Sequence, residues 1–305
     1  MLDPGLNLPA GKLSDFGQRP KMMASRLQER ISMTRVLRLA GLAGALLLSG
    51  CQAVNTTSGG AVGVQRQQYM FSMLSSDQLN QMYAQSYRET LSKAASSGKL
   101  DKSSALAQRV DGVARRLIAQ APAFRADALN WNWEINLIDS DELNANVGPG
   151  GKIIVYSGLV RQLNLSDAEL AAVLGHEIAH ALREHSREAI SKAYGAELAK
   201  QGAVALLGLG EAGGQLADVA VQYGMTLPNS RGHENEADLI GLELAARAGF
   251  DPNAAITLWN KMAQAGNGAP PEFMSTHPAS STRQANLRAA IPRVMPLYEQ
   301  ARGQR

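Results

Sequence analysis

The chain of 305 residues has little of several residue types on which common classes of protein depend. It has one cysteine, Cys51, so it can form no intrachain disulfide, and this thiol lies far upstream of every histidine. Its net charge of +3 comes without a basic run or an aromatic platform, which argues against a nucleic-acid partner. Its N-terminal apolar run is about a dozen residues, short of the roughly 20 that span a bilayer as a helix.

Histidine is also scarce, but all five histidines fall between residues 176 and 277. The first two belong to His176-Glu-Ile-Ala-His180 and are spaced i and i+4, so on a helix they share one face and can bind one metal ion. Glu177 lies about 100° round the helix from His176 and can reach a metal-bound water, which predicts a general base. The same five-residue pattern also arises by chance in helices rich in alanine and glutamate.

A second acidic pattern, Glu234-Asn-Glu-Ala-Asp238, supplies what the first lacks. A catalytic zinc needs a third protein ligand and an open position for water. Glu234 is predicted to be that ligand, beside His176 and His180, for one zinc ion per chain. Asp238 follows one turn later and is predicted to accept the outer N–H of a ligand histidine. By the same helical spacing, Glu236 is expected to point elsewhere.

Local patterns predict an α+β fold that is mainly helical, with a small β-sheet beside the active-site helix. Ser166-Asp-Ala-Glu169 has the form of a capping box and opens the helix that carries the histidines. Residues 77–96 and 103–120 are also expected to be helical, and the alternation from Trp131 to Leu137 predicts a strand. His185 and His233 fall on other helix faces, so we expect neither to be a metal ligand. His185 is expected either at the surface or behind a ligand histidine.

These motifs together resemble the HtpX, Oma and CAAX-endopeptidase family of zinc metallopeptidases, within the gluzincins. The pattern is most similar to its periplasmic branch, which includes LoiP and BepA. Ser230-Arg-Gly-His-Glu234 after the His-Glu-x-x-His helix, the run Gly148 to Leu159, and Thr276-His277-Pro278 with Arg283 carry the resemblance. It implies a zincin-like metallopeptidase domain, with His176, His180 and Glu234 as ligands and Glu177 as the base. It also implies that His277 is a removable fourth ligand or an oxyanion stabiliser, although a histidine before proline is otherwise a simple turn residue.

A strand before the active-site helix is the expected place for substrate. The β-branched run Lys152 to Tyr156 is bounded by glycines, and its residues Ile153, Ile154, Val155 and Tyr156 are predicted to form a sheet-edge strand on which an extended peptide adds. A core strand without substrate contact fits the same run equally well.

The N-terminal part resembles a bacterial lipoprotein signal. A basic start at Met33 is followed by apolar residues and by Leu48-Ser-Gly-Cys51, which predicts lipidation of Cys51 and a membrane anchor. The expected location is the bacterial cell envelope, as a periplasm-facing outer-membrane lipoprotein. The expected segments are a non-native or mis-called extension (1–32), the signal peptide (33–50), the lipidated cysteine with a flexible tether (51–66), the zinc metallopeptidase domain (67–298) and a tail (299–305).

Two functions remain open from the sequence. One is a membrane-tethered zinc endopeptidase that hydrolyses misfolded or misassembled envelope proteins, in contact with the outer-membrane assembly machinery. The other is a periplasmic chaperone or assembly factor that uses a peptidase-like cleft to hold its clients. The intact Glu177 favours the peptidase, because a chaperone has no use for a general base.

Overall fold

The computed structural model describes residues 51–72, 74–207, 230–265, 271–278 and 280–303. The chain divides into two compact units, Met1–Gly50 and Cys51–Arg305, and the described residues all belong to the second. The expected extension 1–32, the expected signal peptide 33–50 and most of the glycine-rich stretch 202–224 lie outside the described residues.

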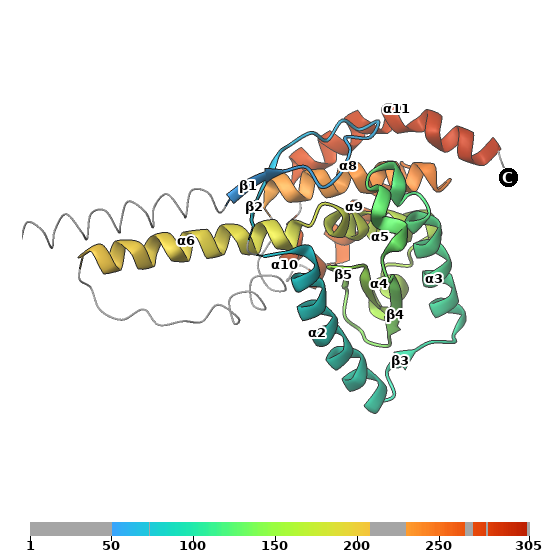
Figure 1. The fold of residues 1–305 in the computed structure, drawn as a ribbon. Helices are drawn as coiled ribbons and strands as arrows, with labels where there is room; N and C mark the ends of the chain where they lie inside the picture. The colour runs from blue at the N-terminus through green and yellow to red at the C-terminus, as the bar shows by residue number, and fades with distance from the viewer. Residues whose placement is uncertain (1–50, 73, 208–229, 266–270, 279, 304–305) are drawn as a thin grey trace, which may run out of the picture. The chain divides into compact units, whose positions relative to one another are not determined.

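The fold is mainly helical with small sheets, which confirms the predicted class (Figure 1). Its helices are α2 (Ser76–Ser96), α3 (Ala105–Ile118), α4 (Ser157–Gln162), α5 (Asp167–Leu182), α6 (His185–Leu207), α8 (Arg231–Arg247), α9 (Ala254–Ala265), α10 (Glu272–Thr276) and α11 (Ser281–Gly303), with 3-10 turns η1 (Ala121–Ala123) and η2 (Ala126–Asn130). Its strands are β1 (Cys51–Val54), β2 (Gln68–Phe71), β3 (Leu100–Asp101), β4 (Glu134–Ile138), β5 (Ala145–Gly148) and β6 (Lys152–Tyr156).

The larger sheet has the strand order β3-β4-β6-β5, and only the β4–β6 pair is parallel. Strand β6 therefore lies inside the sheet, and among the described residues β5 is the edge strand beside it. The prediction that Ile153 to Tyr156 form the edge is wrong, because Ile153 and Val155 are fully buried and Ile154 is nearly so. A continuous β-branched run is typical of a strand buried on both faces, which is the alternative that the sequence had left open.

Helix α5 is the centre of the fold and packs against α3, α8, α9 and β5. Its N-terminus has the predicted capping box, in which the Ser166 Oγ accepts the Glu169 N–H and the Glu169 carboxylate accepts the Ser166 N–H. Along α5 every residue from Val173 to Leu182 is buried. Such a helix is placed by packing on all sides, so the side chains that it carries are held in fixed positions.

Helices α5 and α8 approach each other at two glycines. A Cβ atom added to Gly241 of α8 would lie 2.6 Å from the backbone nitrogen of His176, and one added to Gly175 of α5 would lie 2.8 Å from the Gly241 carbonyl oxygen. Both contacts are with backbone atoms, which cannot rotate away. The two glycines therefore allow backbone contact between the two helices, and Gly175 directly precedes the predicted ligand His176.

Residues 51–66 do not form the flexible tether that we expected. Cys51 begins β1, which pairs with β2 in a two-stranded antiparallel sheet. Val62 and Val64 are buried in the main core, and the Val62 N–H donates to the buried Glu243 carboxylate at 2.9 Å. The segment is thus part of the folded unit.

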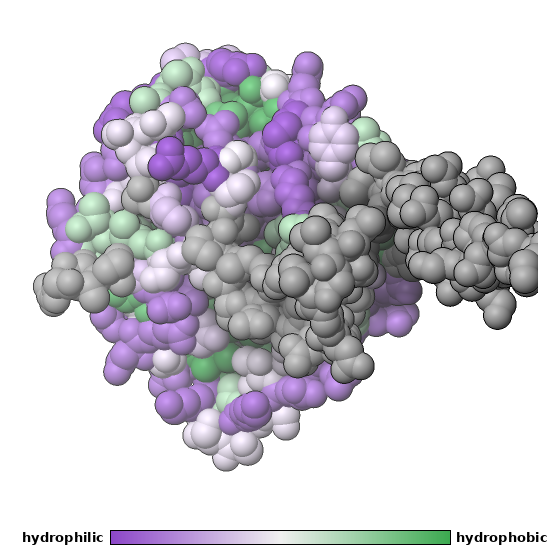
Figure 2. All heavy atoms as spheres, turned by 90° about the vertical axis from the view of Figure 1, so that its left-hand side faces the viewer, coloured by the Kyte–Doolittle hydropathy of each residue, from purple (hydrophilic) through white to green (hydrophobic). Residues whose placement is uncertain are grey.

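The described surface is mostly polar. On the face drawn in Figure 2, hydrophilic residues cover most of the described area, and hydrophobic residues form small patches between them. Among the described residues, the large apolar side chains that are exposed are Tyr69, Met82 and Leu129. No helix in the described ranges combines the length and the hydropathy needed to cross a membrane.

Candidate metal centre and active site

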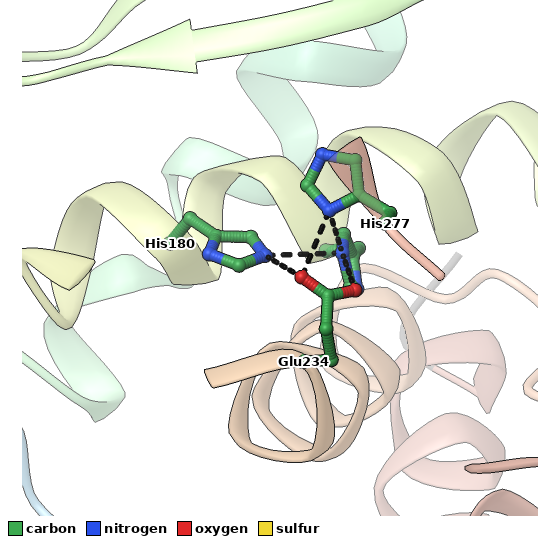
Figure 3. Close-up of side chains that lie close together, drawn as sticks. His180, Glu234 and His277 are labelled. Atoms are coloured by element: carbon green, nitrogen blue, oxygen red, sulfur yellow. Dashed lines mark hydrogen bonds and ion pairs between the residues drawn. The ribbon is translucent and has the colours of Figure 1, made fainter. Parts of the chain in front are cut away.

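Four buried side chains, His176, His180, Glu234 and His277, converge on one point and could hold a metal ion (Figure 3). Their ligand atoms all lie within 4.8 Å of one another. The His180 Nε2 atom is 3.1 Å from the His176 Nε2 atom and 3.3 Å from the Glu234 Oε1 atom. The His277 Nδ1 atom is 3.0 Å from the Glu234 Oε1 atom and 3.1 Å from the His176 Nε2 atom.

The chemistry of this cluster fits a zinc-type cation. Three imidazoles and a carboxylate are the nitrogen and oxygen donors that zinc binds. Ring nitrogens that face each other at 3.1 Å cannot both be unprotonated, because two lone pairs would meet, so a proton or a cation has to lie between them. A shared cation satisfies all four acceptors at once.

Three elements supply these groups. His176 and His180 come from α5, one turn apart as the spacing predicted, and Glu234 comes from the first turn of α8. His277 follows α10 and stacks on the Phe273 ring with 4.5 Å between centroids. The structure therefore brings together residues that are about a hundred positions apart in the chain.

Glu177 lies beside the cluster. Its Oε2 atom accepts a hydrogen bond of 3.1 Å from the Val147 N–H of β5, and its Oε1 atom lies 3.2 Å from the His277 Nε2 atom. Burial raises the pKa of the Glu177 carboxyl above its ordinary value, although His277 and His176 oppose the shift. A raised pKa is what a carboxylate needs to accept a proton near neutral pH.

Asp238 and Arg283 support the cluster from behind. The Asp238 Oδ1 atom lies 3.0 Å from the His176 Nδ1 atom, and Arg283 donates two hydrogen bonds to the same carboxylate, at 2.6 Å and 2.7 Å. Burial alone would raise the pKa of Asp238, but the bonds from Arg283 and His176 keep it below the ordinary value. The Arg283 Nη1 atom also lies 2.7 Å from the Glu234 carboxylate, so Arg283 contacts both Asp238 and Glu234 of α8.

The two α5 histidines differ in protonation when no metal is present. For His176, burial lowers the pKa, but the Glu234 and Asp238 carboxylates outweigh it and raise the pKa to about 9. For His180, burial outweighs Glu234 and lowers the pKa to about 3. At neutral pH His176 therefore carries the proton that a metal ion has to displace.

A second layer of buried polar groups lies behind His180. His185, expected on another helix face, is 1% exposed, and its Nδ1 atom lies 2.9 Å from the His180 Nδ1 atom. Glu236, expected to point elsewhere, is buried and lies 3.1 Å from the His185 Nε2 atom. His233 stacks on His185 with 4.3 Å between centroids and contacts Glu188.

The reason for the wrong placement of His185 is a break between α5 and α6. Glu184 adopts a left-handed backbone conformation with φ of 49°, so the helical spacing that we assumed from His176 onward ends before His185. The Glu184 carboxylate holds this turn by contacts with Ser76, Arg125 and Arg187. No glycine or proline marks the break, so local sequence gave no signal for it.

A cleft of about 440 Å³ opens beside His180. Its walls include Val147 of β5, the loop residue Gly150, Trp131 and the turn residue Glu184. The cleft therefore passes between the edge strand and the end of α5, next to the metal cluster.

Curated relatives with similar sequences are metalloendopeptidases and a protease. Mitochondrial metalloendopeptidase OMA1 of Schizosaccharomyces pombe is 41% identical over 162 residues, 52% of this chain and 47% of the relative. The protein of the same name from Arabidopsis thaliana is 36% identical over 159 residues, 52% of this chain and 32% of the relative. The beta-barrel assembly-enhancing protease of Escherichia coli (strain K12) is 30% identical over 206 residues, 64% of this chain and 41% of the relative. The matched part thus spans less than half the length of these relatives.

These relatives contradict the predicted location. We expected a periplasm-facing outer-membrane lipoprotein of the bacterial envelope, but the relatives that share 34–41% identity are mitochondrial proteins from two yeasts, a plant and cattle. The prediction relied on a short basic and apolar leader that ends at Cys51. A pattern of that length is local and compositional, whereas the match to the mitochondrial proteins extends over much of the folded unit.

The predicted family is confirmed by a broader comparison. The model of Peptidase family M48 matches residues 104–291. This range includes α5, α8 and the loop that carries His277, so the whole metal cluster and Glu177 fall inside it. Because the match covers more than half of the sequence, the chain belongs to peptidase family M48.

Proposed function

We propose that this chain is a zinc-dependent endopeptidase that hydrolyses peptide bonds in misfolded or misassembled proteins. The observation that carries the proposal is the buried cluster of His176, His180, Glu234 and His277 with the Glu177 carboxylate beside it. His176, His180 and Glu234 would hold one zinc ion, and Glu177 would act as the general base. Bound zinc lowers the pKa of a coordinated water to about 7 and polarises a carbonyl.

Other steps of the reaction would be carried out by side chains of the protein. Glu177 accepts the proton of the attacking water and later returns it to the leaving amine. Its orientation is held by the Val147 N–H, which bonds one carboxylate oxygen and leaves the other directed at the cluster. Asp238 and Arg283 hold His176 and Glu234 in place, so the site is preorganised before substrate binds.

Substrate would lie along β5. In the described sheet β5 pairs on one side only, with β6, and it borders the cleft beside His180. A peptide that adds to β5 as another strand would pass directly over Glu177, because Val147 is in that strand. The role first given to Ile153 to Tyr156 therefore moves to Ala145–Gly148.

His277 would occupy the fourth position of the zinc at rest. It contacts Glu234, His176 and Glu177 at 3.0 to 3.2 Å, and it directly follows the five-residue helix α10. A water or a substrate carbonyl would have to displace it. In this arrangement the resting chain is inhibited by its own loop.

Two observations bear on the nature of the substrates. The name of the Escherichia coli relative links that protein to β-barrel assembly, and an edge strand binds backbone without regard to sequence. Both are consistent with a role in protein quality control.

The test is zinc content and cleavage of unfolded casein by the full chain, compared with Glu177→Gln and with Glu299→Gln, an exposed glutamate of α11. We expect one zinc per chain in all three proteins and a loss of about 10²–10⁴-fold in cleavage only for Glu177→Gln. Absence of zinc from the parent chain would refute the proposal. Zinc without cleavage, combined with equal suppression of aggregation by the parent and Glu177→Gln, would favour a client-holding chaperone instead.

A further inference from the structure

The two histidines of α5 have different partners on their outer ring nitrogens. His176 faces a carboxylate, since its Nδ1 atom is 3.0 Å from Asp238. His180 faces another imidazole, since its Nδ1 atom is 2.9 Å from the Nδ1 atom of His185. A metal-binding histidine usually gives its outer N–H to a carboxylate, a backbone carbonyl or a water, and this hydrogen bond fixes its tautomer. The environment of His180 therefore needs its own explanation.

Only one assignment of protons satisfies the contacts from His180 through His185 to Glu236. If the His180 Nε2 lone pair points to the metal, its Nδ1 atom carries the hydrogen, so the His185 Nδ1 atom has to accept. The His185 hydrogen is then on Nε2, from which it donates to the Glu236 Oε2 atom at 3.1 Å. Each donor meets an acceptor, and the hydrogen bonds run in one direction from the metal cluster to a carboxylate.

The Glu236 carboxylate, which accepts the last of these hydrogen bonds, is held by two arginines. Arg183 donates its Nε–H to Glu236 at 2.9 Å and is itself fully buried. Arg66 also donates to Glu236, and it binds Glu188 through two hydrogen bonds of 2.7 and 2.8 Å. These two arginines hold the Glu236 carboxylate in place, with an oxygen directed at His185.

The backbone conformation at Glu184 places His185 beside His180. The left-handed Glu184 lies between the end of α5 and the start of α6, so that His185 folds back towards His180. A non-glycine residue in this conformation is strained, and such strain persists only where the surroundings enforce it. The contacts of Glu184 with Arg125, Ser76 and Arg187 provide that constraint.

We propose that His185 is a positioning residue of the metal site, and that with Glu236 it fixes the tautomer and orientation of His180 and thereby sets the affinity for zinc. The inference rests on the proposed zinc site. His185 would accept the outer N–H of His180, as Asp238 accepts that of His176. Through Arg66 it also connects the metal site to the N-terminal segment before β2.

The experiment measures the zinc dissociation constant of the full chain by competition with a chromophoric chelator. His185→Phe removes both hydrogen bonds. His185→Asn places an amide oxygen near the former Nδ1 position and keeps an acceptor for His180, whereas His185→Gln places its amide near the former Nε2 position and serves only Glu236. His233→Phe is the matched control, because His233 is an equally buried imidazole that contacts Glu188 and stacks on His185 without reaching His180.

We expect His185→Phe to weaken zinc binding by about 10–100-fold, the effect typical of a lost outer partner. The Gln variant should resemble Phe, the Asn variant should recover part of the loss, and His233→Phe should stay within about threefold of the parent. Replacing zinc by cobalt gives a second readout, since the visible spectrum of bound cobalt should change for His185→Phe and not for His233→Phe.

Three results would overturn the inference. They are unchanged zinc affinity in His185→Phe, an equal loss in His233→Phe, and equal losses in the Asn and Gln variants. If the Phe variant does not fold, the comparison of Asn with Gln decides alone. A parent chain that binds no zinc would instead refute the proposed function, so the two failures are distinguishable.

Discussion

Replacing Gly241 by alanine tests whether the contact between α5 and α8 sets the geometry of the metal site. The added Cβ atom would lie 2.6 Å from the His176 nitrogen and 2.7 Å from the Gly175 carbonyl carbon. Ordinary contact begins at 3.4 Å, so the two helices have to separate by about 0.8 Å. Metal ligands tolerate displacements of only about 0.2 Å. The separation would move Glu234 on α8 away from His176 and His180 on α5.

We therefore expect Gly241→Ala to weaken zinc binding markedly, measured by chelator competition. In urea denaturation, overpacking should destabilise the fold by about 1–3 kcal/mol, offset by up to about 1 kcal/mol from the higher helix propensity of alanine. Gly112→Ala in α3 is the matched control, because a Cβ there meets nothing within 4 Å. That variant should gain about 0.5–1 kcal/mol and bind zinc normally. If Gly241→Ala behaved like Gly112→Ala, the helix contact would not control the site.

Three further predictions follow from the site and its helix. His277→Ala should increase casein cleavage and leave one zinc per chain, because it removes the proposed resting ligand. A loss of cleavage as large as that of Glu177→Gln would instead assign His277 to oxyanion stabilisation. Zinc affinity should rise about tenfold per pH unit from pH 6 to about 9 and then level off, because zinc binding displaces the proton of His176, whose pKa is about 9. His180, with a pKa of about 3, is already neutral over this range. Calorimetric titration that detects no proton release on zinc binding at pH 7 would contradict this prediction. Ser166→Ala removes the N-terminal cap of α5, so it should lower the free energy of unfolding in urea by about 1 kcal/mol and leave the zinc affinity unchanged. An unchanged urea midpoint would mean that tertiary packing alone stabilises the N-terminus of α5.

The parts of the fold that depend on short-range patterns could be predicted from the sequence. The capping box at Ser166 and the helical spacing through His180 act within a few residues, and α5 begins where they indicated. The i and i+4 spacing of Glu234 and Asp238 likewise placed both acids on the face of α8 that meets His176.

Long-range packing and rare backbone conformations could not be predicted in this way. The run Ile153 to Tyr156 is compatible with an edge strand or an interior strand, and only its pairing with both β4 and β5 decides between them. The position of His185 depends on the left-handed Glu184, which is held by side chains from other parts of the chain. The packing of Val62 and Val64 depends on partners far along the sequence, while their polar surroundings resemble a linker.

The edge position of β5 has a consequence for which proteins the chain can select. If substrate pairs with β5 as proposed, a strand added beside Ala145–Gly148 would be recognised through its peptide groups, which every sequence possesses. In a native domain those groups are already paired with neighbouring strands or helices, so they are not free to join another sheet. An extended segment of several residues becomes accessible only where the native pairing has been lost. Selection would then depend on the conformational state of a protein, and a client would escape cleavage by folding.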